Sequence, residues 1–174
     1  MSRGRSGAYW AANRYPDEAV EPDPAAPRAD LPPAAAGRFS AVRRGLRALD
    51  GVAENVRYMG LPWRWAWEYA VGSRKLCWLH IVGDDVAATF TLSDTEEGRL
   101  RATGRLATGL ARAMEEGQQT GPVKWCWIEL RDRRAVETFL RFVRRKAEWL
   151  AERTPPRRAP RPRPLRGDDV PDTG

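Results

Sequence analysis

The sequence predicts an α+β domain in two layers, with a four-stranded antiparallel sheet and three helices packed on one face of it, in the order α-β-β-β-α-β-α. Large apolar side chains alternate with other residues from position 63 to position 71, as in a strand with two unlike faces. Turn-forming residues at 72–73 and 83–85 join this run to two more strand-like runs, so the three strands should be antiparallel neighbours. Three other stretches repeat apolar residues every third or fourth position, which indicates amphipathic helices.

The stretch from Trp63 to Leu92 contains these three strands and organises the prediction. The run from Leu76 to Val82 carries apolar residues at both odd and even positions, which is typical of a central strand covered on both faces. Residues 86–92 alternate again and include Thr and Phe, which suit a pleated surface. We therefore expect residues 76–82 to form an interior strand.

The remaining elements follow from periodicity and capping. Residues 38–57 carry one apolar stripe and predict the first helix, which Gly60 and Pro62 end. Ser93 and Glu96 have the spacing of a capping box at the start of a second helix, which we expect to run to Gly117. Residues 123–130 predict the fourth strand, and a third helix follows the plausible N-cap Asp132.

Composition divides the chain into three parts. Residues 1–36 form a Pro- and Ala-rich arm, which we expect to be disordered with its aromatic residues exposed, docking on the domain being the alternative. Residues 37–153 form the α+β domain. Residues 154–174 form a Pro- and Arg-rich tail that we also expect to be disordered, and whose prolines could bind a protein partner as a polyproline II segment.

The chain has the composition of a cytoplasmic protein. No apolar stretch reaches the roughly 20 residues that a membrane-spanning helix needs, and the first residues lack the apolar core of a secretory signal. The two cysteines, Cys77 and Cys126, both lie in apolar strand-like runs, which favours buried thiols in a reducing compartment over a disulfide. We therefore predict a cytoplasmic location and no membrane partner.

Several positions across the domain resemble the small bacterial family called domain of unknown function 3788. The similarity consists of an aromatic strand, a central strand that begins Lys-Leu-Cys, a third strand before a helix, and a Trp-bearing last strand before the terminal helix. It implies an α+β fold over about residues 37–153, covers neither the arm nor the tail, and implies no activity, cofactor or site. The matching residues are Trp63, Trp65, Tyr69, Lys75, Leu76, Cys77, Phe90, Leu92, Lys124, Trp125, Ile128, Leu130 and Asp132.

Catalytic and metal chemistry have little support in the sequence. The single histidine, His80, lies in the central strand and could act as a general base only beside a carboxylate such as Glu68 or Glu129. A histidine satisfied within the core is the commoner outcome. Cys77, Cys126 and His80 lack the close paired spacing of a zinc site, and no phosphate-cradling glycine loop or nucleophile elbow occurs. We predict no metal, no cofactor and, on balance, no enzymatic activity.

The tryptophans raise the main functional question. If those of the strands face the helices they are core, which is the commoner arrangement, and if they face away they form an open aromatic surface for a flat ligand, a partner or stacked bases. In the first case the opposite face of the first strand becomes the solvated or ligand-facing one. The candidate ligand-binding residues are Trp63, Arg64, Trp65, Trp67, Glu68, His80, Trp125, Trp127 and Glu129.

A net charge of +7, carried mostly by arginine, suggests a second surface. The third helix and the tail could form a basic strip that contacts nucleic-acid phosphates without reading sequence, although an ordinary solvated helix face or biased codon usage would give the same pattern. The leading hypothesis is a non-enzymatic binding or interaction module, with nucleic-acid association and a pocket or enzyme around His80, Glu68 and Glu129 as alternatives. The candidate nucleic-acid residues are Arg134, Arg141, Arg144, Arg145, Lys146, Arg157 and Arg158.

Overall fold

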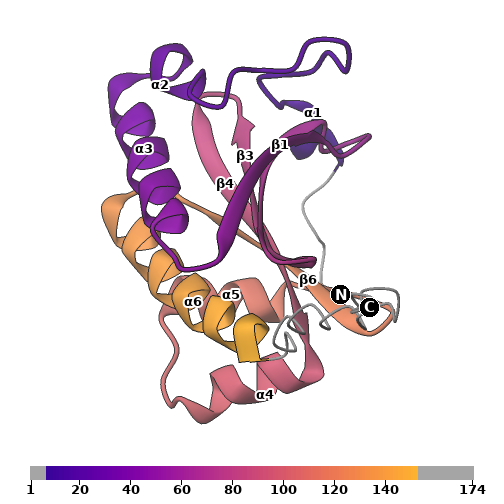
Figure 1. Cartoon of the computed structure of the whole chain (residues 1–174), viewed down its shortest axis with the longest axis vertical. Coiled ribbons are helices and arrows are strands. Elements are labelled where there is room, and N and C mark those ends of the chain that lie inside the picture. The colour runs from indigo at the N-terminus through magenta and orange to yellow at the C-terminus, as the bar shows by residue number, and fades with distance from the viewer. Residues whose placement is uncertain (1–6, 153–174) are drawn as a thin grey trace, which may run out of the picture.

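The computed structural model describes residues 7–152, which form an α+β fold around one antiparallel sheet (Figure 1). The sheet has six strands in the order β1-β2-β3-β4-β6-β5, not the four that we predicted. The strands are β1 (Val52–Tyr58), β2 (Trp65–Val71), β3 (Arg74–Val82), β4 (Asp85–Ser93), β5 (Gln118–Thr120) and β6 (Val123–Glu129). The helices are α1 (Gly7–Ala11), α2 (Pro27–Asp30), α3 (Pro33–Arg47), α4 (Asp94–Ala102), α5 (Thr108–Glu115) and α6 (Arg133–Glu152).

The predicted three-stranded unit is present, because β2, β3 and β4 pair as antiparallel neighbours. Strand β3 lies between β2 and β4 and is buried from Leu76 to Val82, which confirms residues 76–82 as an interior strand. The capping box at the start of α4 is also confirmed: the Glu96 amide donates to Ser93 Oγ and the Ser93 amide donates to Glu96 Oε2, at 3.3 and 2.8 Å.

The first helix ends about ten residues earlier than predicted, and its C-terminal half is a strand. Helix α3 stops at Arg47, and Gly51, with a φ of 72°, turns the chain into β1. Residues Val52, Glu54 and Val56 alternate in burial with their exposed neighbours, and β1 pairs with β2 along its whole length. Apolar residues four and seven positions apart fit a helix. The burial of every second side chain in this segment instead fits the period of two of a strand.

The predicted second helix is two helices. Helix α4 ends at Ala102, and Gly104, with a φ of 97°, takes a conformation that a helix cannot contain. Helix α5 then starts at Thr108 and packs Leu110, Ala113 and Met114 into the core. The segment between the predicted second helix and the predicted fourth strand contains the short strand β5, which pairs with β6.

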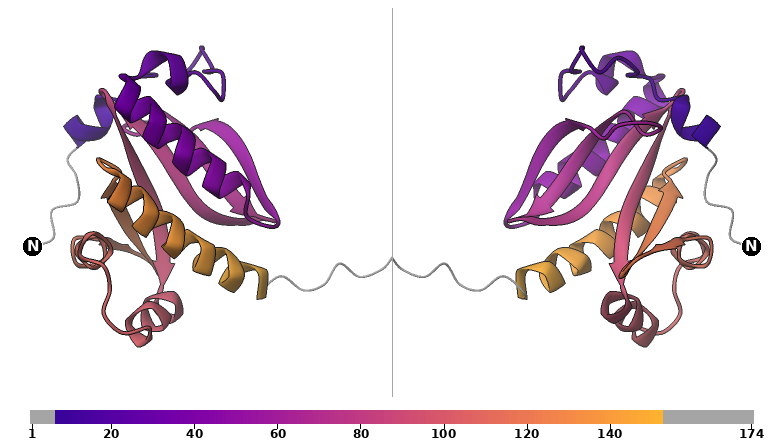
Figure 2. Two further views of the ribbon diagram at one scale, coloured as in Figure 1. Left: turned by 90° about the vertical axis from the view of Figure 1, so that its left-hand side faces the viewer. Right: turned by 90° about the vertical axis from the view of Figure 1, so that its right-hand side faces the viewer.

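The core lies between the sheet and the helices α3 and α6, which lie side by side on one face (Figure 2). Trp67 packs edge-on against Phe39 of α3, and Phe90 packs against Phe142 of α6, with ring centroids 5.5 and 4.6 Å apart. The two helices approach closely at Gly45, where an added Cβ would lie 2.6 Å from a methyl carbon of Leu140. Glycine at this position therefore sets how closely α3 and α6 pack.

Residues 7–36 are ordered against the domain, which corrects the prediction of a disordered arm. The arm pairs with the end of β3 at Asn13 and Val82, and the buried Asn13 amide donates to the carbonyl oxygens of Trp63 and Trp65 at 2.6 and 2.9 Å. The arm then crosses to the helix side, where its carbonyls accept hydrogen bonds from buried indoles. Aromatic and amide anchors of this kind stabilise a segment whose proline content alone suggested disorder.

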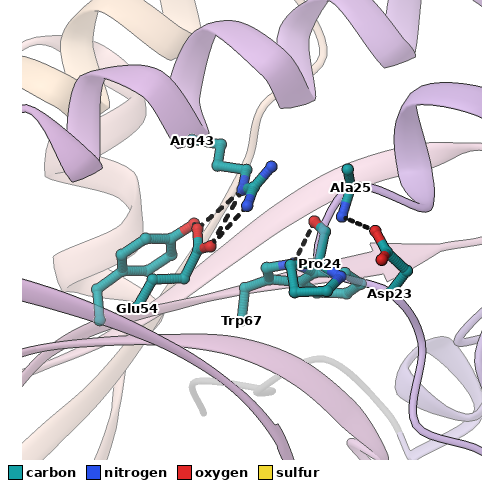
Figure 3. Close-up of polar contacts among 7 residues, drawn as sticks. Asp23, Pro24, Ala25, Arg43, Glu54 and Trp67 are labelled. Atoms are coloured by element: carbon teal, nitrogen blue, oxygen red, sulfur yellow. Dashed lines mark hydrogen bonds and ion pairs between the residues drawn. The ribbon is translucent and has the colours of Figure 1, made fainter.

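Figure 3 shows one of these anchors beside an ion pair that joins α3 to β1. The Trp67 indole N–H donates to the carbonyl of Pro24 at 2.9 Å. The Arg43 guanidinium donates three hydrogen bonds to the Glu54 carboxylate, which also accepts one from the Tyr69 hydroxyl. Burial by itself would raise the pKa of Glu54. The hydrogen bonds from Arg43 and, to a smaller extent, from Tyr69 outweigh burial and hold this pKa below its ordinary value.

The predicted disorder of the tail, residues 154–174, concerns residues outside the part that the structure describes. Within residues 7–152, no helix has both the length and the apolar character needed to span a membrane.

Candidate functional site

The sheet divides its tryptophans between two faces. Trp65 and Trp67 share the face that packs against the helices, so for them the expectation of a core position is correct. Trp78, Trp125 and Trp127 lie on the opposite face, which we call the open face, so the expectation of a position facing the helices is wrong for Trp125 and Trp127. The candidate ligand-binding face is therefore the one away from α3 and α6.

Trp63 joins the open face because of one backbone reversal. Arg64 has a φ of 64°, and a tight loop closes around it through hydrogen bonds from the Met59 amide to the Arg64 carbonyl and from the Arg64 amide to the Gly60 carbonyl. Regular alternation would put Trp63 on the same face as Trp65. The reversal instead turns it toward Trp125, and the Arg64 side chain reaches the arm at the carbonyl of Pro16.

Three indoles stack on the open face in the order Trp63, Trp125, Trp78. The ring centroids of Trp63 and Trp125 lie 6.4 Å apart with an interplanar angle of 26°, and those of Trp125 and Trp78 lie 5.2 Å apart with an angle of 29°. These are offset-stacked arrangements, which aromatic rings prefer over a face-to-face sandwich. Trp63 and Trp125 are only half-buried, so the stack is accessible from solvent.

A pocket of about 110 Å³ opens beside this stack. Four segments far apart in the sequence meet around it: α1, the loop before β2, strand β4, and the β5–β6 hairpin. None of its lining side chains carries a formal charge, and its polar side-chain groups are one hydroxyl, one amide and the indole N–H groups of its tryptophans. We call it the tryptophan pocket, and it is lined by Gly7, Trp10, Pro62, Trp63, Thr89, Gln118, Trp125 and Trp127.

Trp10 connects the tryptophan pocket to the buried histidine. Its ring is 5 % exposed and lies 4.9 Å from the His80 ring, centroid to centroid. His80 is fully buried, Nε2 shares a hydrogen bond of 2.8 Å with Thr89 Oγ1, and Nδ1 has no hydrogen-bond partner. Burial lowers the pKa of His80 to about 3, so the imidazole is neutral at physiological pH.

The structure does not assemble the general base that we considered around His80. Neither ring nitrogen bonds to Glu68 or Glu129. The buried Glu68 carboxylate accepts hydrogen bonds from Lys75 Nζ at 2.6 Å and from the Trp78 indole at 3.1 Å, which gives it a structural role. Glu129 forms an ion pair with Arg131 at 2.6 Å. Glu129 and His80 lie at the same level of the sheet, but strand β4 separates their strands.

The candidate nucleic-acid residues are only partly exposed. Arg134, Arg141, Arg144 and Arg145 are exposed along α6. Lys146 is 1 % exposed and points into the core, so its assignment to a nucleic-acid surface is wrong. Lys146 lies between Val143 and Leu150 in the apolar stripe of α6, so its position in the helix predicts burial although its charge suggests a surface residue. Arg157 and Arg158 lie outside the described residues.

No group of three or more His, Cys, Asp or Glu side chains that could hold a metal ion occurs within residues 7–152. The thiols of Cys77 and Cys126 are buried and free, and burial raises the pKa of Cys126 to about 12. Both are therefore protonated and poor ligands or nucleophiles at neutral pH.

Sequence reasoning missed Trp10, Thr89 and Gln118 as members of the site. An isolated tryptophan in a Pro-rich arm was the one available signal, because such a side chain is rarely left in water. The resemblance to the domain of unknown function 3788 family stays a prediction. Comparisons of the chain with protein-family models, with curated proteins and with solved structures give no match.

Proposed function

We propose that this protein is a non-enzymatic binding module, and that its tryptophan pocket receives a neutral planar group of a ligand or partner. The observation that supports this most directly is the gathering of Trp10, Trp63, Trp125 and Trp127 around one uncharged pocket on the open face. A domain that needed the half-buried rings of Trp63, Trp125 and Trp127 only for stability would bury them under its helices, as it does Trp67.

The lining chemistry supports a flat, uncharged group. The half-buried indoles of the stack offer a flat apolar surface on which another ring can lie. Such stacking contributes about 1–3 kcal/mol per ring. The Thr89 hydroxyl and the Gln118 amide can hydrogen-bond a polar edge of that ring. A formal charge on the ligand would find no counter-charge among the lining residues.

Replacing Trp125 with leucine is expected to weaken binding of a ring-shaped probe roughly 5- to 150-fold, which is the loss of one stacking contact of about 1–3 kcal/mol. Indole is a suitable probe, and NMR chemical-shift titration of the full chain measures its affinity without relying on tryptophan fluorescence. Leucine keeps much of the apolar volume, so thermal unfolding should show a folded variant.

Trp149→Phe is the matched control, because Trp149 lies on α6, where Arg99 covers its ring, and does not line the pocket. It should bind indole as the wild type does. If the wild-type chain shows no shifts at the pocket residues up to millimolar indole, or if Trp125→Leu and Trp149→Phe behave alike, the proposed function is wrong.

A second candidate function is sequence-independent association with nucleic acid through the helix layer. It is favoured by the exposed guanidinium groups of Arg134 and Arg144 on α6 and of Arg28 and Arg44 near α3, for which no ion pair occurs within residues 7–152. The last two line a hollow of about 540 Å³, and four of its six lining residues are arginines. Helices α3 and α6, which carry Arg44, Arg134 and Arg144, lie side by side (Figure 2).

This candidate predicts that binding to a random-sequence DNA duplex weakens steeply with salt, since each phosphate contact contributes about 0.9 to the slope of log K against log salt. Arg144→Gln and Arg44→Gln should each reduce that slope by about 1, as measured by fluorescence anisotropy. Glu148→Gln, which removes an exposed negative charge from α6, should not reduce it. Absence of binding at low ionic strength would exclude this function.

A further inference from the structure

A second pocket, remote from the open face, combines an apolar floor with a basic rim. It has a volume of about 180 Å³ and lies between α6 and the segment that joins α4 to α5. The floor is made by Leu100, Leu110 and Phe142, which are buried, and by the half-buried Leu106. The rim is made by Arg105, Arg141 and Arg145.

The three rim arginines have no counter-charge of their own. Arg141 and Arg145 are one helical turn apart on α6, and Arg105 faces them from the α4–α5 connection. No ion pair or hydrogen bond engages any of their guanidinium groups within the described part of the chain, whereas Arg133 on the same helix pairs with Glu137 at 2.8 Å. Three unpaired cations around one opening repel each other, and an anion placed between them removes that repulsion.

We propose that this pocket, the arginine-rimmed pocket, binds a phosphate monoester of an apolar group, with the phosphate on the rim and the apolar group on the floor. Guanidinium groups match phosphate oxygens in bidentate geometry, and three of them suit a dianion better than a carboxylate. The floor excludes a fully polar ligand, because its leucine and phenylalanine side chains cannot replace the hydrogen bonds of water. The phosphate ester can be free in solution or be the headgroup of an anionic lipid.

The test uses phenyl phosphate, inorganic phosphate and phenol as probes of the full chain by isothermal titration calorimetry. Phenyl phosphate should bind roughly tenfold or more tightly than either fragment alone, since each fragment engages only rim or floor. Arg141→Gln and Arg145→Gln should each weaken phenyl phosphate binding by about tenfold or more. Leu106→Ser should weaken phenyl phosphate but leave inorganic phosphate unchanged.

Arg133→Gln is the matched control, because Arg133 is exposed on the same helix and does not line the pocket. It should leave the affinity within about twofold, a change typical of screened surface charge. Equal binding of inorganic and phenyl phosphate, an equal loss in Arg133→Gln and Arg141→Gln, or no binding of phenyl phosphate at millimolar concentration would each overturn the proposal.

Vesicles of phosphatidylcholine with and without phosphatidic acid distinguish the two sources of the ester. If phenyl phosphate binds and the acidic vesicles also retain the wild-type protein but not Arg141→Gln, the natural ligand is a lipid headgroup. If phenyl phosphate binds and the vesicles do not, it is a soluble ester. Retention on acidic vesicles without any phenyl phosphate binding would contradict the pocket and indicate a diffuse basic surface.

Discussion

Replacing Lys146 with alanine is expected to lower the free energy of unfolding by about 3–5 kcal/mol, which is the typical cost of breaking one side of a buried ion pair. Lys146 Nζ lies 3.3 Å from Glu96 Oε1 and donates to the carbonyl of Thr91. Glu96 also accepts the amide of Ser93 in the capping box, so one lysine on α6 holds the end of β4 and the start of α4 together. The alanine variant would leave both a buried carboxylate oxygen and a buried carbonyl without a partner.

Chemical denaturation at neutral pH measures this loss, and two further variants identify its cause. The double variant Lys146→Met with Glu96→Gln removes both charges while keeping volume, and should recover part of the stability that Lys146→Ala loses. Arg144→Ala, on the exposed side of α6, should change stability by no more than about 0.5 kcal/mol. A loss below about 1 kcal/mol in Lys146→Ala would show that the ion pair does not hold these elements together.

Acidification from pH 6.5 to pH 5 is expected to destabilise the wild-type protein by about 1.5–2 kcal/mol through His80 alone. Burial lowers the pKa of His80 from 6.5 to about 3 in the folded state. Between these values the unfolded chain binds a proton that the folded chain does not, so stability is fully present above pH 6.5 and falls as the pH falls. His80 is the single histidine of the chain, and the range from pH 6.5 to pH 5 lies above the ordinary pKa of 4.5 for Glu. The loss of stability in this range is therefore assigned to His80.

Urea denaturation at several pH values measures how the free energy of unfolding changes with pH. This change should approach about 1.4 kcal/mol per pH unit near pH 5. His80→Gln preserves a hydrogen-bonding group for Thr89 but does not titrate, so its stability should stay flat over the same window. Below pH 4.5 both proteins should lose further stability, because the pKa values of Glu54 and Glu97 are lowered in the folded state. A flat wild-type profile between pH 6.5 and 5 would show that His80 is accessible to protons.

The central part of the fold could be predicted because its signals are local. The β2–β3–β4 unit has short turns and clear alternation, and the α4 capping box has a fixed spacing of three residues. The strand β1 was missed because Val52, Val56 and their neighbours fit both a helical and a strand period. The arm was missed because its order depends on contacts such as Asn13 with Trp63 and Trp65, about fifty residues away, which no local pattern records.

The site was harder to predict than the fold, because a residue's face in a sheet depends on single backbone angles. Regular alternation assigns Trp63, Trp65 and Trp67 to one face, and the positive φ of Arg64 separates the first from the other two. The charge of Lys146 suggested a surface residue, whereas its place in the stripe of α6 puts it in the core. In both cases the three-dimensional position overrides the usual preference of the residue type.

Trp10 lines the tryptophan pocket and also packs against the imidazole of His80. A ligand bound in this pocket stabilises the folded state, whereas a proton on His80 favours the unfolded chain, so ligand binding and acid unfolding oppose each other. If the proposed function is correct, occupancy of the module therefore protects the chain against acid unfolding without any charged group among the lining residues of the pocket.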